Sequence, residues 1–163
     1  MQTCCMAGNG LYSENFGLQI DAESVLLSPD SIAEFSMPYL KRLANDFGGA
    51  SIHYCGRHDG FTRQIWDTPE LNGINFGIVP GKTHDQRFEW VMEGCLKSGT
   101  VSYGQWPRRD DETFKDYLRH LYHWASQGCL IPEIAPEQSC MDEPILKDNP
   151  RLICNLWEEL HAG

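Results

Sequence analysis

Long apolar runs are absent from this sequence, and so is any excess of positive charge. No stretch approaches the roughly 18–20 consecutive apolar residues that a membrane-spanning helix needs. Lys and Arg number 13 against 23 Asp and Glu, which gives a formal net charge of −10 at pH 7. A nucleic-acid backbone and an anionic membrane surface both attract clustered basic side chains. The sequence therefore predicts no membrane span. It also predicts that neither a nucleic acid nor an anionic membrane is the main partner.

An export signal and a disulfide framework are also absent. The opening residues, Met1–Gly8, lack the basic region and the apolar stretch of a signal peptide, so we expect a cytoplasmic protein. The seven cysteines are odd in number and widely spaced. Without an export signal, this pattern favours free thiols, metal ligands or buried side chains over disulfides.

What the sequence does contain is a regular alternation of short apolar runs and helical patterns. In a chain of 163 residues this indicates one domain, with residues 1–12 as a poorly defined leader. Five strands are predicted, with a helix after each: Phe16–Ile20, Ala50–Cys55, Gly73–Gly77, Thr100–Gln105 and Cys129–Ile134. Strict alternation implies an α/β fold with parallel strands and right-handed crossovers. A doubly wound sheet and part of an eight-stranded (β/α) barrel both fit.

Two helices have recognisable start signals. Ser28 suits the N-cap of the first helix, with Pro29 in its first turn. Asp110 or Asp111 suits the N-cap of the helix after the fourth strand. The helical period of the first helix predicts one buried apolar stripe. Its members are Ile32, Phe35, Tyr39, Leu40, Leu43 and Phe47.

The sharpest chemical feature is the end of the second strand, which reads Ser51-Ile52-His53-Tyr54-Cys55-Gly56. Alternate side chains of a strand share a face, so His53 and Cys55 are expected to point the same way near the strand's carboxyl end. Active sites lie at that end in both candidate architectures. An imidazole and a thiolate two residues apart on one face can both bind a soft or borderline metal such as zinc. Simple packing of a buried Cys55 is the alternative.

A catalytic zinc site has three protein ligands and one open position. Cys140 follows the last strand, on the rim where His53 and Cys55 are expected. Cys129 opens that strand, which places it at the opposite end of the sheet. We therefore favour Cys140 as the third ligand and keep Cys129 as the alternative. Trp106, just after the fourth strand, is interpreted as lining a substrate pocket, with packing as an equal alternative.

At these residues the sequence resembles the uroporphyrinogen decarboxylase superfamily. The matching stretches are Leu26-Leu27-Ser28-Pro29 with Phe35, Met37-Pro38-Tyr39-Leu40-Lys41-Arg42-Leu43, and Ile52-His53-Tyr54-Cys55-Gly56. Gly73–Gly77 looks like that family's next strand, and the resemblance spans roughly Ser13 to Pro136. It implies a (β/α)8 TIM barrel about twice as long as this chain. This chain would supply the C-terminal half, with about five βα units.

Two branches of that superfamily imply different chemistry. Its zinc-dependent methyltransferases move a methyl group from a methylated corrinoid to a thiol, and they carry a His-x-Cys-Gly strand end plus a later cysteine. His53, Cys55 and Gly56 match this pattern, which implies a catalytic pair, His53 and Cys55, with Cys140 completing the metal site. The other branch decarboxylates uroporphyrinogen in porphyrin biosynthesis, without a cofactor, and uses a late histidine. The loop Ala135–Cys140 has none, so the decarboxylase-type lyase is the alternative.

The resemblance also implies partners. Zinc would be the cofactor, methylcobalamin the co-substrate, a thiol or a tetrapyrrole the small-molecule substrate, and a corrinoid protein a macromolecular partner. Glu14 and Gln19, near the first strand, are expected to contact substrate. A half barrel leaves two sheet edges unpaired, and such edges recruit other chains. We therefore expect a homo-oligomer or a complex with a separate N-terminal half, and a non-catalytic half barrel is the remaining alternative.

Overall fold

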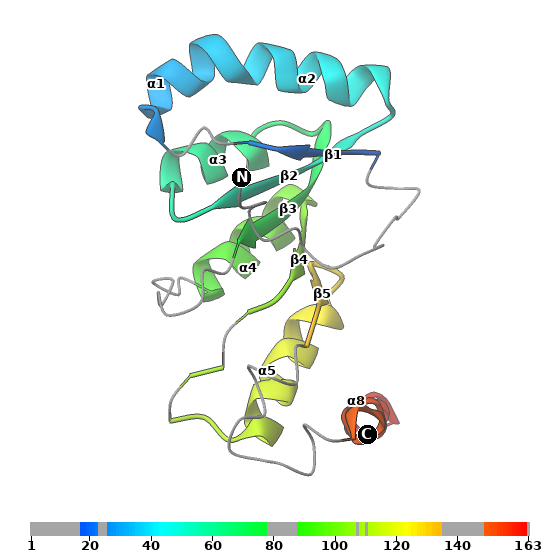
Figure 1. Cartoon of the computed structure of the whole chain (residues 1–163). Coiled ribbons are helices and arrows are strands. Elements are labelled where there is room, and N and C mark those ends of the chain that lie inside the picture. The colour runs from blue at the N-terminus through cyan, green and yellow to red at the C-terminus, as the bar shows by residue number, and fades with distance from the viewer. Residues whose placement is uncertain are drawn as a thin grey trace.

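The molecule is built around one parallel sheet (Figure 1). The computed structural model describes residues 17–22, 26–77, 88–106, 108–109, 111–134 and 149–162. The strands are β1 (Leu18–Asp21), β2 (Ala50–Cys55), β3 (Leu71–Gly77), β4 (Val101–Gly104) and β5 (Leu130–Pro132). They form a five-stranded sheet in the order β1-β2-β3-β4-β5, and each neighbouring pair is parallel. The predicted α/β class is confirmed.

The strand order separates the two architectures that the sequence left open. A doubly wound sheet reverses its strand order at a switch point. Across the described residues, spatial order follows chain order without such a reversal. Right-handed crossovers between strands in this order place successive helices on the same side of the sheet, as in a singly wound (β/α) arrangement. Over the described residues, the observed order is that of a singly wound (β/α) arrangement and lacks the reversal of a doubly wound sheet.

Helices connect and follow the strands. They are α1 (Pro29–Ser31), the π-helical turn η2 (Ile32–Ser36), α2 (Met37–Asp46), α3 (Asp59–Trp66), α4 (Phe88–Ser98), α5 (Phe114–Ala125) and α8 (Pro150–Ala162). In Figure 1, α1 and α2 lie beyond β1 at one end of the sheet, while α5 and α8 lie at the other. Within the described ranges, no helix has the length and apolarity to cross a membrane.

The helix starts confirm one prediction and correct another. The Ser28 side chain accepts a hydrogen bond from the Ser31 backbone N–H at 3.1 Å, so it caps α1 as predicted. The cap of α5 is Thr113, whose hydroxyl oxygen accepts from the Asp116 backbone N–H at 3.1 Å. Asp110 or Asp111 was the wrong choice because the helix begins later. Thr followed by an acidic residue three positions on resembles the capping-box pattern, which was the stronger signal.

Pro38 is accommodated by the π-helical turn that precedes α2. Proline has no N–H to donate within a helix. At this point the backbone N–H of Met37 bonds to the Ile32 carbonyl, five residues back. The helix is thus widened by one residue immediately before the proline.

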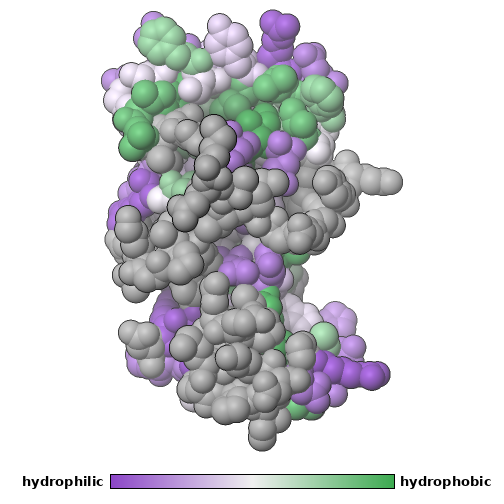
Figure 2. Space-filling model, in the orientation of Figure 1, coloured by the Kyte–Doolittle hydropathy of each residue, from purple (hydrophilic) through white to green (hydrophobic). Residues whose placement is uncertain are grey.

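Only two of the six residues in the predicted apolar stripe of the first helix are buried. Ile32 and Leu40 are buried, together with Met37 and Ala44, which the prediction omitted. The other predicted members are exposed: Phe35 (62%), Tyr39 (66%), Leu43 (38%) and Phe47 (60%). The apolar surface of this helix is wider than the face that the core covers. Figure 2 shows apolar atoms gathered over this helical layer, at the top of the view.

Candidate functional site

The two side chains of the central motif lie side by side. His53 and Cys55 come from β2 and share one face of the sheet, with the Cys55 Sγ 3.7 Å from the His53 Nε2. His53 is 2% exposed, and Cys55, at the carboxyl end of the strand, is half-buried. Tyr54, between them, faces the opposite side and packs on Phe61 of α3, with ring centroids 5.3 Å apart. The predicted common face is confirmed.

A polar side chain from the next strand completes this cluster. Asn75 lies beside His53 in the β2–β3 register. Its Oδ1 is in hydrogen-bond contact with the His53 Nδ1, and its Nδ2 donates to the backbone carbonyl of Tyr103 on β4 at 2.5 Å. Asn75 is 2% exposed. One continuous polar connection therefore crosses three strands, from the Cys55 thiol to the β4 backbone.

A second bond across the same strands reinforces this face. The Tyr103 hydroxyl donates to the Ser51 Oγ at 3.3 Å, spanning β3 where the intervening strand carries Gly73. Burial raises the pKa of the Tyr103 phenol, and its bond to Ser51 only partly offsets this, so the phenol stays neutral. Gly104, next in β4, has a φ of +105°, and a Cβ there would overlap the Asn75 amide.

The His53–Cys55 pair fits two ligands of a tetrahedral zinc ion. Zn–S and Zn–N bonds of about 2.3 and 2.05 Å at a tetrahedral angle place the two ligand atoms about 3.6 Å apart. The Nε2–Sγ separation is 3.7 Å. Within the described residues, however, no group of three His, Cys, Asp or Glu side chains is placed to hold an ion. The donor types and spacing therefore fit zinc, and a third ligand must come from elsewhere in the chain or from a partner.

Comparison with known proteins finds no relative of this chain, since no protein-family model, curated protein or solved structure matches it. The superfamily resemblance therefore rests on the sequence motifs, and the chemistry of the site rests on the contacts among His53, Cys55 and Asn75.

The other predicted ligands and contacts are not gathered at this pair. Cys140 and Glu14 lie outside the described residues. Cys129 directly precedes β5 and its thiol donates to the Trp124 carbonyl at 3.4 Å, so it sits at the strand's amino end, as expected. Gln19 is exposed on β1 and pairs with Ser51, which puts it on the face that carries His53. Its contact with substrate stays a prediction.

Trp106 belongs to a different cluster. Its ring packs on Phe76 and on Phe88 of α4, with centroids 5.5 and 4.8 Å apart, and its indole N–H donates to the Ser102 Oγ at 3.3 Å. Phe76 faces away from Asn75 because neighbouring residues of a strand alternate. Trp106 therefore lines a small cavity with Arg109 and His120, on the side of the sheet opposite His53.

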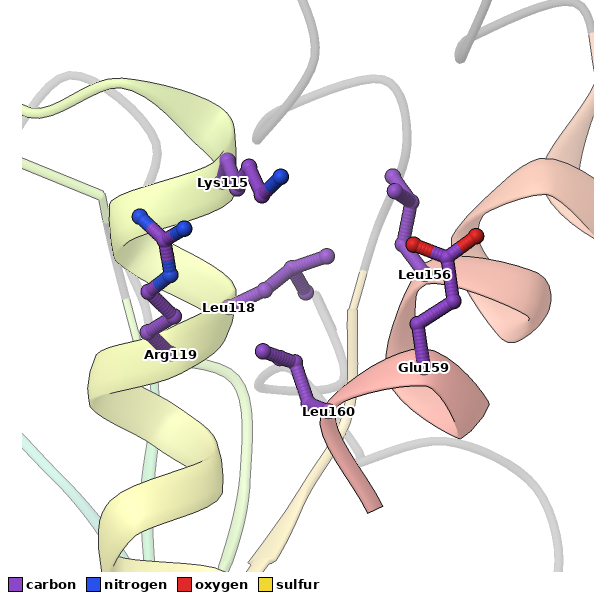
Figure 3. Close-up of a pocket in the computed structure, with 6 residues that line it drawn as sticks. All are labelled: Lys115, Leu118, Arg119, Leu156, Glu159 and Leu160. Atoms are coloured by element: carbon purple, nitrogen blue, oxygen red, sulfur yellow. The ribbon is translucent and has the colours of Figure 1, made fainter. Parts of the chain in front are cut away.

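A further surface pocket lies between α5 and α8 (Figure 3). Leu118 of α5 points toward Leu156 and Leu160 of α8, and charged side chains stand at its edge. The lining residues are Lys115, Leu118, Arg119, Leu156, Glu159 and Leu160. This set includes no thiol or imidazole, so it offers neither a nucleophile nor zinc ligands of the kind found on β2.

Asn75 is the site residue that the sequence reasoning missed. The signal was present, since Gly73-Ile74-Asn75-Phe76-Gly77 places the amide between two glycines on one face of a predicted strand. An amide in that position has no large neighbour on its own strand and so can reach the strands on either side. What was not readable was the register that sets Asn75 opposite His53.

Proposed function

We propose that this chain is part of a (β/α) barrel enzyme of the uroporphyrinogen decarboxylase superfamily that transfers a methyl group from a methylated corrinoid to a thiol. The observation that supports it is a distance: the His53 Nε2 lies 3.7 Å from the Cys55 Sγ, at the carboxyl end of a central parallel strand. In this proposal His53 and Cys55 hold zinc, and Cys140 is the third ligand. The sequential sheet supports the barrel.

The reaction has a simple balance. A carbon–sulfur bond forms between the methyl group and the acceptor thiol, the cobalt–carbon bond breaks with its electron pair left on cobalt, and the thiol proton leaves. When bound, zinc supplies the positive charge that keeps a thiol deprotonated at neutral pH. The chain's own contribution is placement. Buried His53 and half-buried Cys55 keep two fixed donors at the sheet end, where substrate arrives.

The test is methyl transfer by the purified chain loaded with zinc. We expect loss of methylcobalamin absorbance to depend on an added thiol and on the metal, because the metal-free protein lacks the charge that activates the thiol. Zinc-loaded protein that consumes no methylcobalamin with any thiol would count against methyl transfer. Metal-free protein that turns over uroporphyrinogen would instead support the decarboxylase.

A half barrel that needs a second chain is the second candidate, and the exposed apolar stripe favours it. Phe35, Tyr39, Leu43 and Phe47 are exposed along η2 and α2, and among the described strands β1 pairs with β2 alone. Exposed apolar patches and open sheet edges mark association surfaces. In a purified sample, the surface available to cover this stripe is that of another copy. We therefore propose self-association through it.

Sedimentation velocity over a range of concentrations checks this prediction. Wild type should show a concentration-dependent rise in mean mass, and Tyr39→Lys should suppress it by putting a charge into the stripe. Leu96→Lys is the matched control, because Leu96 is an exposed apolar residue (45%) on α4, outside the stripe. Both variants change the net charge equally, from −10 to −9. Wild type that stays monomeric throughout contradicts the prediction.

A further inference from the structure

We propose that Asn75 is a positioning residue that fixes the tautomer of His53, with the proton on Nδ1 and a bare Nε2 facing Cys55. The inference deepens the proposed function in one respect, since a bare Nε2 is the form of imidazole that binds a metal. The tautomer itself does not depend on any metal. It follows from the hydrogen bonds that link β2, β3 and β4.

The argument begins at the Tyr103 backbone carbonyl, which can only accept a hydrogen bond. The Asn75 amide atom 2.5 Å from it must therefore be the nitrogen, which donates. The other amide atom is then the oxygen, which can only accept, and it contacts the His53 Nδ1. His53 must consequently donate from Nδ1. In the neutral ring the remaining nitrogen, Nε2, carries no proton and lies 3.7 Å from the Cys55 Sγ.

The surroundings hold the amide in this orientation. Asn75 and His53 are each 2% exposed, so bulk water does not compete for their hydrogen bonds. Rotating the amide by half a turn would set oxygen against the Tyr103 carbonyl and lose both bonds. Gly104, which follows Tyr103, leaves space for the Asn75 nitrogen that any side chain would fill. The register supplies the alignment, with Asn75 directly opposite His53.

This arrangement matches the general form of a metal-binding histidine. Such a ring donates its second N–H to a carbonyl or carboxylate, which fixes its orientation, and losing that partner weakens metal binding about 10–100-fold. Here the Asn75 side-chain carbonyl is the partner, and the amide is itself anchored to Tyr103. Asn75 touches neither the proposed substrate nor the thiol in any described contact, so its role is to orient His53.

Nitrogen NMR of the metal-free protein tests the tautomer directly. The chain has six histidines, so His53→Gln identifies the His53 resonances by their loss. In wild type we expect the neutral ring to show a protonated, pyrrole-type Nδ1 and a bare, pyridine-type Nε2. In Asn75→Leu, Nδ1 loses its acceptor, and the signals should shift toward a tautomer mixture. Asn75→Asp loses the bond to the Tyr103 carbonyl but retains an acceptor oxygen for Nδ1, so it should keep Nδ1 protonated.

Asn45→Leu is the matched control, because Asn45 is exposed on α2 and its side chain donates to the Lys41 carbonyl of the same helix, away from β2 and β3. It should leave the His53 spectrum unchanged. A wild-type spectrum with a protonated Nε2 and a bare Nδ1 overturns the inference without any variant. So does an Asn75→Leu variant that folds and keeps the wild-type tautomer. If Asn75→Leu does not fold, the wild-type and Asn75→Asp spectra still decide the matter.

Zinc titration separates this inference from the proposed function. If both hold, Asn75→Leu should bind zinc about 10–100-fold more weakly than Asn75→Asp or Asn45→Leu. If wild type shows the expected tautomer but binds no zinc, the proposed function fails and the role of Asn75 stands. If wild type binds zinc with the opposite tautomer, the role of Asn75 fails and the proposed function stands.

Discussion

Replacing His53 with Ala or Cys55 with Ser should abolish zinc binding. Wild type prepared with zinc should hold about one ion per chain, the stoichiometry of a catalytic site with three protein ligands. Each variant leaves at most two of those ligands, and a soft thiolate is not replaced by a hydroxyl. We expect retained zinc to fall below about a tenth of an ion per chain, measured by elemental analysis after dialysis.

The controls separate ligand loss from general damage. Cys154→Ser removes an exposed thiol on α8 and should keep full zinc. Cys95→Ser removes a buried thiol and should also keep full zinc. Burial raises the pKa of the Cys95 thiol to about 12, so it stays protonated and is a poor ligand. Because His53 is buried, His53→Ala leaves a cavity, and His53→Gln repeats the test with less loss of volume. Full zinc in both His53→Gln and Cys55→Ser would remove the basis of the proposed function.

The parts of this site that follow from local pattern were predictable. Strand β2 has the predicted bounds, Ala50–Cys55, because residues of two-residue period between flanking glycines leave few alternatives. The common face of His53 and Cys55 follows from the two-residue period of a strand. The Ser28 cap is also local, since it depends on the next three residues.

The parts that depend on tertiary contacts were not predictable. Asn75 joins the site through strand register, which no single segment encodes. Burial of the first helix was misjudged because periodicity shows which residues are apolar, and the neighbours decide how many of them are covered. Trp106 follows β4 as expected, and its ring packs on Phe76 and Phe88, which fits the packing alternative; only the tertiary structure shows which side of the sheet it covers.

A polar connection inside a parallel sheet needs a reason, because a buried polar group is unfavourable unless it is hydrogen-bonded. The amide of Asn75 is bonded at both ends and His53 is bonded through Nδ1, so both are compatible with the interior. Apolar residues would form a sheet more simply at these positions. The cluster ends at a half-buried thiol on the strand's carboxyl end, which is the end of parallel α/β sheets where active sites are generally found.

Gly104→Ala should be the most destabilising small substitution near the site. Gly104 has a φ of +105°, which a residue with a Cβ adopts only under strain, and its Cβ would overlap the Asn75 amide nitrogen. Backbone strain and overpacking each cost about 1–3 kcal/mol. Displacing Asn75 also breaks buried hydrogen bonds to His53 and Tyr103. We expect the free energy of unfolding, measured with urea, to fall by about 4 kcal/mol.

Gly128→Ala isolates the backbone contribution to that loss. Gly128 also has a positive φ, +81°, but a Cβ there would meet nothing within 4 Å. Gly128→Ala should lower the free energy of unfolding by about 1 kcal/mol, which is the backbone strain of a left-handed residue alone. In the double variant Asn75→Ala, Gly104→Ala, the amide that would overlap the new methyl group is gone. The double variant should therefore lose less stability than the sum of the two single losses. Equal losses for Gly104→Ala and Gly128→Ala, or strict additivity in the double variant, would mean that Gly104 does not make room for Asn75.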